Sequence, residues 1–124
     1  MDNLFSLPLL HCLMNWIELH NETQLEEIRE RSTNRPQLIF KHSTRCSTSA
    51  LVKNRLERAQ PPADIDFYYL DLIRYRPVSN KVAHTFNIDH ESPQILLIRN
   101  GQCVYDESHM RITMDGVVDA SGVF

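Results

Sequence analysis

Short apolar runs alternate along this chain with segments of helix-spaced apolar residues, which predicts an α/β domain. The runs have the length of buried strands, and the segments between them repeat apolar residues every three or four positions, as one face of a helix does. We expect strands at residues 15–19, 37–40, 66–70, 94–98 and 102–105. We expect helices from Thr23 to just before Pro36, at 47–60, at 77–86 and after Thr113.

Residues that start or stop secondary structure lie where these elements meet. Thr23 with Glu26 forms the capping-box pattern at the start of the first helix, and the proline pair at 61–62 ends the second helix. Asn100-Gly101, between two apolar runs, predicts a two-residue hairpin turn. The spacing on the second helix directs four side chains toward the core: Leu51, Val52, Leu56 and Ala59.

The resulting order, β-α-β-α-β-α-β-β-α, predicts the fold. Strands separated by a crossover helix pair in parallel, and a terminal hairpin adds an antiparallel edge. This is a thioredoxin-like three-layer α/β/α sandwich with a mixed sheet, and we assign residues 14–124 to it as one domain. Residues 1–13 are expected to be an N-terminal extension, disordered or arising from a misassigned start codon. A short amphipathic helix on the domain is the alternative for this segment.

Composition and charge exclude several classes of function. A net charge of −3 lacks the basic excess that nucleic-acid binding requires, and no apolar run approaches the about 20 residues of a membrane-spanning helix. The three cysteines, at positions 12, 46 and 103, are odd in number and contain no CxxC pair, unlike the disulfide framework of a secreted protein. We therefore expect a cytoplasmic protein with reduced thiols that binds neither nucleic acid nor membranes.

Cys46 lies where a predicted strand, a short polar loop and a predicted helix follow one another. A sulfur at a helix N-terminus meets unpaired backbone N–H groups and the positive end of the helix dipole, which favour thiolate over thiol. Arg45 and Lys41 add positive charge nearby. Because the thiolate is the nucleophile in disulfide exchange, we predict that Cys46 is the reactive residue. The alternative is a buried structural cysteine, which the polar neighbours of Cys46 disfavour.

Ser49, three residues after Cys46, indicates a monothiol mechanism. Dithiol oxidoreductases carry a second cysteine there that attacks the mixed disulfide, whereas a hydroxyl can only hydrogen-bond to the thiolate across one helical turn. Cys103 is a poor substitute, because the predicted hairpin sets it opposite Ile98, roughly 16 Å along a strand from Pro93. A disulfide requires Cα atoms within about 7 Å, so we expect Cys103 to pack in the core or on a sheet face.

Ser92-Pro93 precedes the fourth predicted strand. A proline just before a central strand is awkward unless it is the first residue of the strand or part of a turn. Proteins with the thioredoxin fold carry a cis-proline at this place, facing the active cysteine, and the residue before it pairs through its backbone with an extended thiol substrate. We therefore expect a cis Ser92–Pro93 bond and a substrate-binding role for both residues.

Three segments carry a family resemblance: FKHSTRCSTSALVKNRLE at 40–57, RYRPVSNKVAHTFNIDHESPQILLIRNGQCVY at 74–105 and the SH pair at 108–109. They resemble the monothiol bacilliredoxins, the YtxJ-like proteins. The resemblance implies a thiol-disulfide oxidoreductase that removes bacillithiol from S-bacillithiolated proteins. Cys46 would attack the mixed disulfide, take up bacillithiol and be freed by a second low-molecular-weight thiol. Members usually have proline after the active cysteine, where this chain has Ser47, a difference that bears on redox tuning and leaves the nucleophile in place.

Two other functions remain open from the residues themselves. One is a glutaredoxin-like protein that serves another low-molecular-weight thiol. The other is a thioredoxin-fold module without turnover, in which Cys46 only docks a client or senses oxidant. The Ser49 pattern permits all three functions, and the resemblance favours the first.

Bacillithiol is a cysteinyl-glucosamine linked to malate, and its two carboxylates favour cationic partners. The candidates are Arg45, Lys41 and Arg76, with solvated surface charge as the alternative for each. The six histidines show no metal-ligand spacing, so we expect no metal and no bound cofactor, with bacillithiol as a co-substrate. His42 and His90 flank the two loops of the predicted site, where either can adjust the thiolate through charge or hydrogen bonding.

Overall fold

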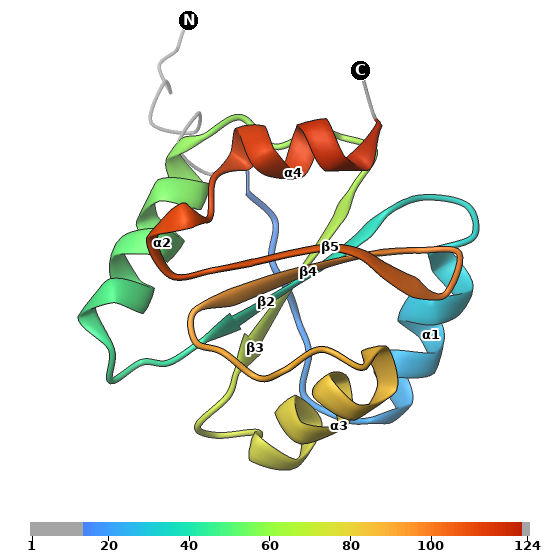
Figure 1. The fold of residues 1–124 in the computed structure, drawn as a ribbon, viewed down its shortest axis with the longest axis horizontal. Coiled ribbons are helices and arrows are strands. Elements are labelled where there is room, and N and C mark those ends of the chain that lie inside the picture. Colours follow the sequence, from blue (N-terminus) through green and yellow to red (C-terminus); the bar gives the residue numbers. More distant parts are fainter. Residues whose placement is uncertain (1–13, 123–124) are drawn as a thin grey trace, which may run out of the picture.

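The structure is a computed structural model that describes residues 14–122, and the predictions for residues 1–13 lie outside this range. The elements in chain order are β1 (Ile17–Glu18), α1 (Thr23–Arg31), β2 (Gln37–His42), α2 (Ser47–Arg58), β3 (Asp66–Asp71), α3 (Arg76–Phe86), β4 (Gln94–Arg99), β5 (Gln102–Ser108), η2 (His109–Arg111) and α4 (Met114–Ser121) (Figure 1). The predicted order is confirmed, and the 3₁₀ turn η2 is an addition between β5 and α4.

The strands form one mixed sheet in the order β1-β3-β2-β4-β5. β1 and β2 lie parallel to β3, as predicted for strands joined by helices. β4 pairs antiparallel with β2, so the prediction of parallel pairing is wrong for this strand. The register gives the reason: Asp71, at the end of β3, lies beside His42, and Gln94, at the start of β4, lies beside Lys41. The chain therefore returns through α3 to the same end of the sheet at which β3 finished. We call this end, where His42, Asp71 and Gln94 lie, the carboxyl edge.

Helices cover both faces of the sheet (Figure 1) and enclose two hydrophobic cores. α1 and α3 pack on one face against residues such as Ile39 and Leu96, and α2 and α4 pack on the other against residues such as Phe40 and Leu97. Successive residues of β2 alternate between these cores, and all six of them are buried. The predicted three-layer α/β/α sandwich is confirmed.

One side chain of α2 faces the other way from the prediction. Leu51, expected in the core, is 55% exposed. The buried face of α2 consists of Ser49, Val52 and Leu56. Because one residue step turns a helix by about 100°, Leu51 points away from the position of Val52.

The predicted Thr23–Glu26 capping box is also absent. Thr23 is already the first residue of α1, and Asn21 Oδ1 accepts the backbone N–H of Gln24 at 3.0 Å. Gln24 Oε1 in turn accepts the backbone N–H groups of His20 and Asn21, at 2.7 and 3.1 Å. The oxygen that satisfies the first turn of the helix therefore comes from Asn21, a favoured capping residue.

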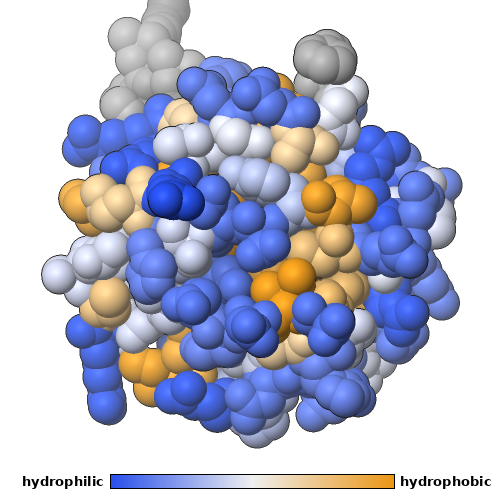
Figure 2. Space-filling view, viewed as in Figure 1, coloured by the Kyte–Doolittle hydropathy of each residue, from blue (hydrophilic) through white to orange (hydrophobic). Residues whose placement is uncertain are grey.

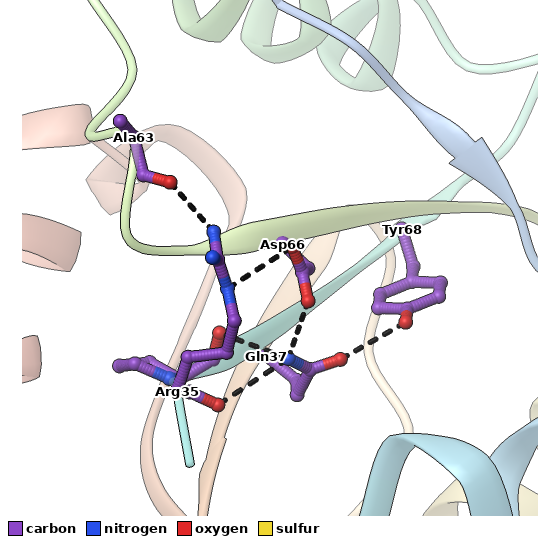
Figure 3. Close-up of polar contacts among 6 residues, drawn as sticks. Arg35, Gln37, Ala63, Asp66 and Tyr68 are labelled. Carbon is purple, nitrogen blue, oxygen red and sulfur yellow. Dashed lines mark hydrogen bonds and ion pairs between the residues drawn. The ribbon is translucent and has the colours of Figure 1, made fainter. Parts of the chain in front are cut away.

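At the opposite edge of the sheet, a polar network fixes the start of β2 against β3 (Figure 3). Gln37 is fully buried, its Nε2 donates to Asp66 Oδ2 at 2.7 Å, and its Oε1 accepts the Tyr68 hydroxyl at 2.9 Å. Arg35 Nε lies 3.2 Å from Asp66 Oδ1, and its Nη2 donates to the Ala63 carbonyl at 2.6 Å. A slip of the β2–β3 register would break these contacts and leave the buried Gln37 amide without its partners on β3.

Apolar side chains form small patches among polar ones on the face shown in Figure 2. Leu51, Val104 and Met110 are the large apolar side chains that are exposed in the described part of the chain. Across residues 14–122, every helix is too short or too polar to cross a membrane.

The β4–β5 hairpin closes through the predicted Asn100-Gly101 turn. The φ angles of Asn100 and Gly101 are 52° and 78°, the left-handed values of a type I′ turn. The turn also contacts the end of α1, since the Asn100 N–H donates to the Ser32 carbonyl at 2.9 Å and the Gly101 N–H donates to Ser32 Oγ at 2.8 Å. The hairpin is thus held at its tip as well as along its strands.

Replacing Gly101 by alanine should lower the free energy of unfolding by about 1 kcal/mol, because a Cβ is disfavoured at positive φ. A Cβ at this position would meet no atom within 4 Å, so the effect comes from the backbone and not from a clash. Urea unfolding followed by circular dichroism measures it. Gly101→Asn is the matched control and should lose less stability, because asparagine tolerates this conformation. Equal stability of wild type and Gly101→Ala would contradict this account of the turn.

Candidate active site

Cys46 is the N-cap residue of α2, with the extended backbone angles of φ −114° and ψ 120°. Its carbonyl accepts the Ala50 N–H at 3.1 Å, and its N–H donates to the Ser43 carbonyl at 3.2 Å. The residue is partly exposed, and no side chain caps the start of α2. The sulfur therefore lies at the positive end of the helix dipole, where first-turn N–H groups have no side-chain acceptor.

Ser49 makes its hydrogen bonds toward β2 and the loop before Cys46. It is fully buried, its Oγ accepts the Ser43 N–H at 3.1 Å, and the same atom lies 2.6 Å from His42 Nδ1. Burial, together with the charge of Lys53, holds the pKa of His42 below its ordinary value. With its proton on Nε2, a neutral imidazole accepts the Ser49 hydroxyl on Nδ1, and with its proton on Nδ1 it donates to Ser49 Oγ. Neither contact of Ser49 involves the Cys46 sulfur, so its direct support of the thiolate stays a prediction.

The Ser92–Pro93 peptide bond is cis, as expected. Pro93 is buried and directly precedes β4, which begins at the carboxyl edge. Because Gln94 lies beside Lys41 on β2, Pro93 reaches the same end of β2 from which the loop to Cys46 departs. Ser92 Oγ is buried and has no hydrogen-bond partner among the residues that the structure describes.

Gln94 holds the loop before Pro93. Its side chain is 1% exposed, its Nε2 donates to the Asp89 carbonyl at 2.9 Å, and its Oε1 accepts the Glu91 N–H at 3.3 Å. A buried amide with both of its polar ends bonded to one loop restrains that loop. The backbone around Ser92 is therefore fixed from within the sheet.

The cationic candidates differ in their exposure. Arg45 lies in the exposed turn before Cys46, and Arg76 is exposed as the first residue of α3. Lys41, in contrast, is fully buried. Its Nζ donates to the Ser79 carbonyl at 3.2 Å and lies 3.2 Å from His90 Nδ1, and burial lowers its pKa to about 8. Lys41 is thus not the surface cation that its place in the sequence suggested.

His109 is a site residue to which the sequence analysis gave no role. Its N–H donates to the Pro93 carbonyl at 2.9 Å, and its Nε2 lies 3.0 Å from Glu91 Oε1. A positive φ of 59° at His109 accompanies these two contacts. The one available signal was the SH pair within the family resemblance, which carried no chemical meaning by itself.

Arg55 connects the same turn to the helix of Cys46. From α2, its Nη1 donates to the Met110 carbonyl at 2.8 Å and to the Ile112 carbonyl at 2.9 Å. Because His109 begins η2 and also bonds to the Pro93 loop, η2 links the two sides of the candidate site.

Cys103 lies far from this arrangement. It pairs with Ile98 across the hairpin, as predicted, near the end of β4 that is remote from Pro93. Its half-buried sulfur donates to the Tyr105 carbonyl at 3.4 Å, and burial raises the pKa of this thiol to about 11. Cys103 packs against the core beneath α1 and α3, which is a structural position.

The described residues contain no group of three or more His, Cys, Asp or Glu side chains that could hold a metal ion.

Comparison with known proteins agrees with this arrangement. Residues 17–117 match the family model of the monothiol bacilliredoxin BrxC. A solved structure described as an oxidoreductase with a thioredoxin fold superimposes with a TM-score of 0.73 and 30% identity, covering 84% of this chain and 91% of that one.

Thioredoxins with lower identity share the fold. The Malassezia sympodialis thioredoxin Mala s 13 has a TM-score of 0.68 and 14% identity, covering 87% of this chain and 89% of its own. Schistosoma mansoni thioredoxin has a TM-score of 0.66 and 21% identity, covering 90% and 97%. The predicted thioredoxin-like fold is confirmed, and the family match supports a thiol redox role. The chain belongs to the monothiol bacilliredoxin family.

Proposed function

We propose that this chain is a monothiol disulfide oxidoreductase that removes bacillithiol from S-bacillithiolated protein cysteines in the cytoplasm. The observation that carries the proposal is the position of the partly exposed Cys46 at the uncapped start of α2. The carboxyl edge beside it also carries the cis Ser92–Pro93 bond. A nucleophilic sulfur and a fixed stretch of backbone thus lie at one end of the sheet.

The first step is the transfer of bacillithiol to Cys46. The Cys46 thiolate attacks the bacillithiol sulfur of the mixed disulfide, a new S–S bond forms, and the client cysteine leaves as a thiolate. One disulfide replaces another, so this step involves no net oxidation or reduction.

The second step needs a thiol from outside the chain. A low-molecular-weight thiol gives up its proton to solvent and attacks the bacillithiol sulfur, which forms a small-molecule disulfide and returns Cys46 as a thiolate. Ser49 supplies a hydroxyl at the place of a resolving thiol, and this hydroxyl is already bonded to His42 and Ser43. Cys103, at the remote end of the hairpin, is not positioned to replace it.

Substrate contacts would come from the two loops of the site. Ser92, held before Pro93 by the bonds of Gln94, offers its backbone N–H and carbonyl to the chain that flanks the client cysteine. Arg45, exposed beside Cys46, offers a guanidinium to the carboxylates of bacillithiol.

Thiol release from a bacillithiolated model protein tests the function directly. The purified chain should release bacillithiol, and Cys46→Ser should abolish release, because the serine hydroxyl is too weak an acid to replace the thiolate. A glutathionylated copy of the model protein is the matched substrate control. Equal release from both substrates would replace the proposal with a glutaredoxin-like function. An adduct that stays on Cys46 in the presence of excess thiol would replace it with a binding or sensing module.

Ser49→Ala should lower stability without stopping exchange. The substitution leaves the partly buried Ser43 N–H and the buried His42 Nδ1 without their partner, which costs about 1–3 kcal/mol. Chemical denaturation measures the loss, and Ser47→Ala, at an exposed position in the same turn, should leave stability unchanged. A large fall in the rate of bacillithiol release at unchanged stability would instead mean that Ser49 acts on the Cys46 sulfur.

Cys103→Ser should retain the wild-type rate of bacillithiol release. With a pKa of about 11, the Cys103 thiol is protonated near neutral pH and is a poor nucleophile. The release assay checks this, with circular dichroism to establish that the variant is folded. A folded but inactive Cys103→Ser would show that Cys103 takes part in the cycle.

A further inference from the structure

Lys41 is a fully buried cation without a carboxylate beside it. Its Nζ is bonded to the Ser79 carbonyl and faces His90 Nδ1 at 3.2 Å. Within residues 14–122, no carboxylate lies at ion-pair distance from this ammonium. Buried charges are ordinarily paired, so an uncompensated positive charge lies directly beneath the His90 loop.

Lys41 also determines which ring nitrogen of His90 carries the proton. Burial and the charges of Lys41 and Arg76 hold the pKa of His90 below its ordinary value, against a smaller opposing effect of Glu91. Because an ammonium group can only donate, Nδ1 of the neutral ring is the acceptor and the proton lies on Nε2. His90 is exposed, and it offers an N–H donor on the nitrogen that Lys41 does not occupy.

Among the charges that act on His90, those of Lys41 and Arg76 outweigh that of Glu91. Arg76 is exposed and has no ion pair among the described residues. The neighbouring carboxylate, that of Glu91, is 3.0 Å from His109 Nε2. Ser79 is 1% exposed, and its hydroxyl has no hydrogen-bond partner in the described part of the chain. Through Lys41 of β2, which contacts both the Ser79 carbonyl and His90, these groups come together with Arg76 and the unbonded Ser79 hydroxyl of α3.

We propose that Arg76 and His90 bind a carboxylate of the small-thiol half of the mixed disulfide, with Lys41 as the positioning residue beneath His90. This inference rests on the proposed function and assigns residues to a carboxylate of its small thiol. Arg76 can hold a carboxylate through two N–H groups, and His90 Nε2–H adds a third donor. Lys41 lies beside Gln94 at the carboxyl edge, so the carboxylate site lies at the end of the sheet that carries Cys46.

Two small disulfides of similar size separate charge recognition from thiol chemistry. The rate constant of Cys46 with anionic 3,3′-dithiodipropionate is divided by that with neutral bis(2-hydroxyethyl) disulfide, which cancels differences in folding and in Cys46 ionisation. Loss of one surface charge contact should lower this ratio about fivefold in Arg76→Gln, and His90→Phe should lower it similarly. Lys81→Gln removes an equal charge from an exposed position on the same helix and should leave the ratio unchanged.

The pH dependence of the same ratio tests the role of Lys41. Lys41 loses its proton near pH 8, so the wild-type ratio should fall as pH rises through this value. Lys41→Met should abolish the pH dependence, a result that a purely structural role would not produce. An unchanged ratio in Arg76→Gln and His90→Phe, or an equal fall in Lys81→Gln, would overturn the proposal.

A direct binding measurement removes the dependence on thiol reactivity. Titration of the Cys46→Ser chain with L-malate should give saturable NMR shifts at Arg76 and His90, and Arg76→Gln should remove them. Shifts elsewhere, or none, would refute the site. The two proposals can fail separately, because neither the rate ratio nor malate binding requires release of bacillithiol from a protein.

Discussion

β2 is the central strand of the sheet, and each of its six residues is buried between two layers of helices. A polar side chain in such a strand loses its contact with water and has to find its partner inside the protein. Gln37 finds its partners on β3, Lys41 on α3 and the loop after it, and His42 on α2. These contacts attach three neighbouring parts of the chain to one strand. The burial of β2 thereby determines where the loops of the candidate site lie.

Under the proposed function, Cys46 and the residues that hold it in place meet opposite requirements. Cys46 would have to reach a disulfide on another molecule, and it lies partly exposed at a helix end without a side-chain cap. The groups that hold this end in place, Ser49 and His42, are buried and bonded to each other. Dithiol proteins have their second cysteine at the position of Ser49, whereas in this chain Ser49 holds the loop before Cys46 through buried hydrogen bonds. Such a division lets the sulfur change its bonding partner while the buried contacts around it stay intact.

Local sequence signals were enough to place Cys46, the cis Ser92–Pro93 bond and the Asn100-Gly101 turn. Each of these depends on residues a few positions apart, so the chain pattern contains the required information. Lys41 was misjudged because the apolar run ends one residue before it, whereas pairing with strands on both sides extends β2 through His42. The direction of β4 and the contacts of His109 likewise depend on segments that meet only after folding, and no local pattern records them.

The link through η2 has a thermodynamic consequence for binding. Arg55 holds η2 to the helix of Cys46, and His109 holds η2 to the loop of Pro93. The helix of Cys46 and the loop of Pro93 are therefore joined to each other through η2. Their relative placement is settled during folding, so a ligand does not have to spend binding energy on ordering them. Under the proposed function, this preorganisation favours partners that already present an extended segment around the modified cysteine.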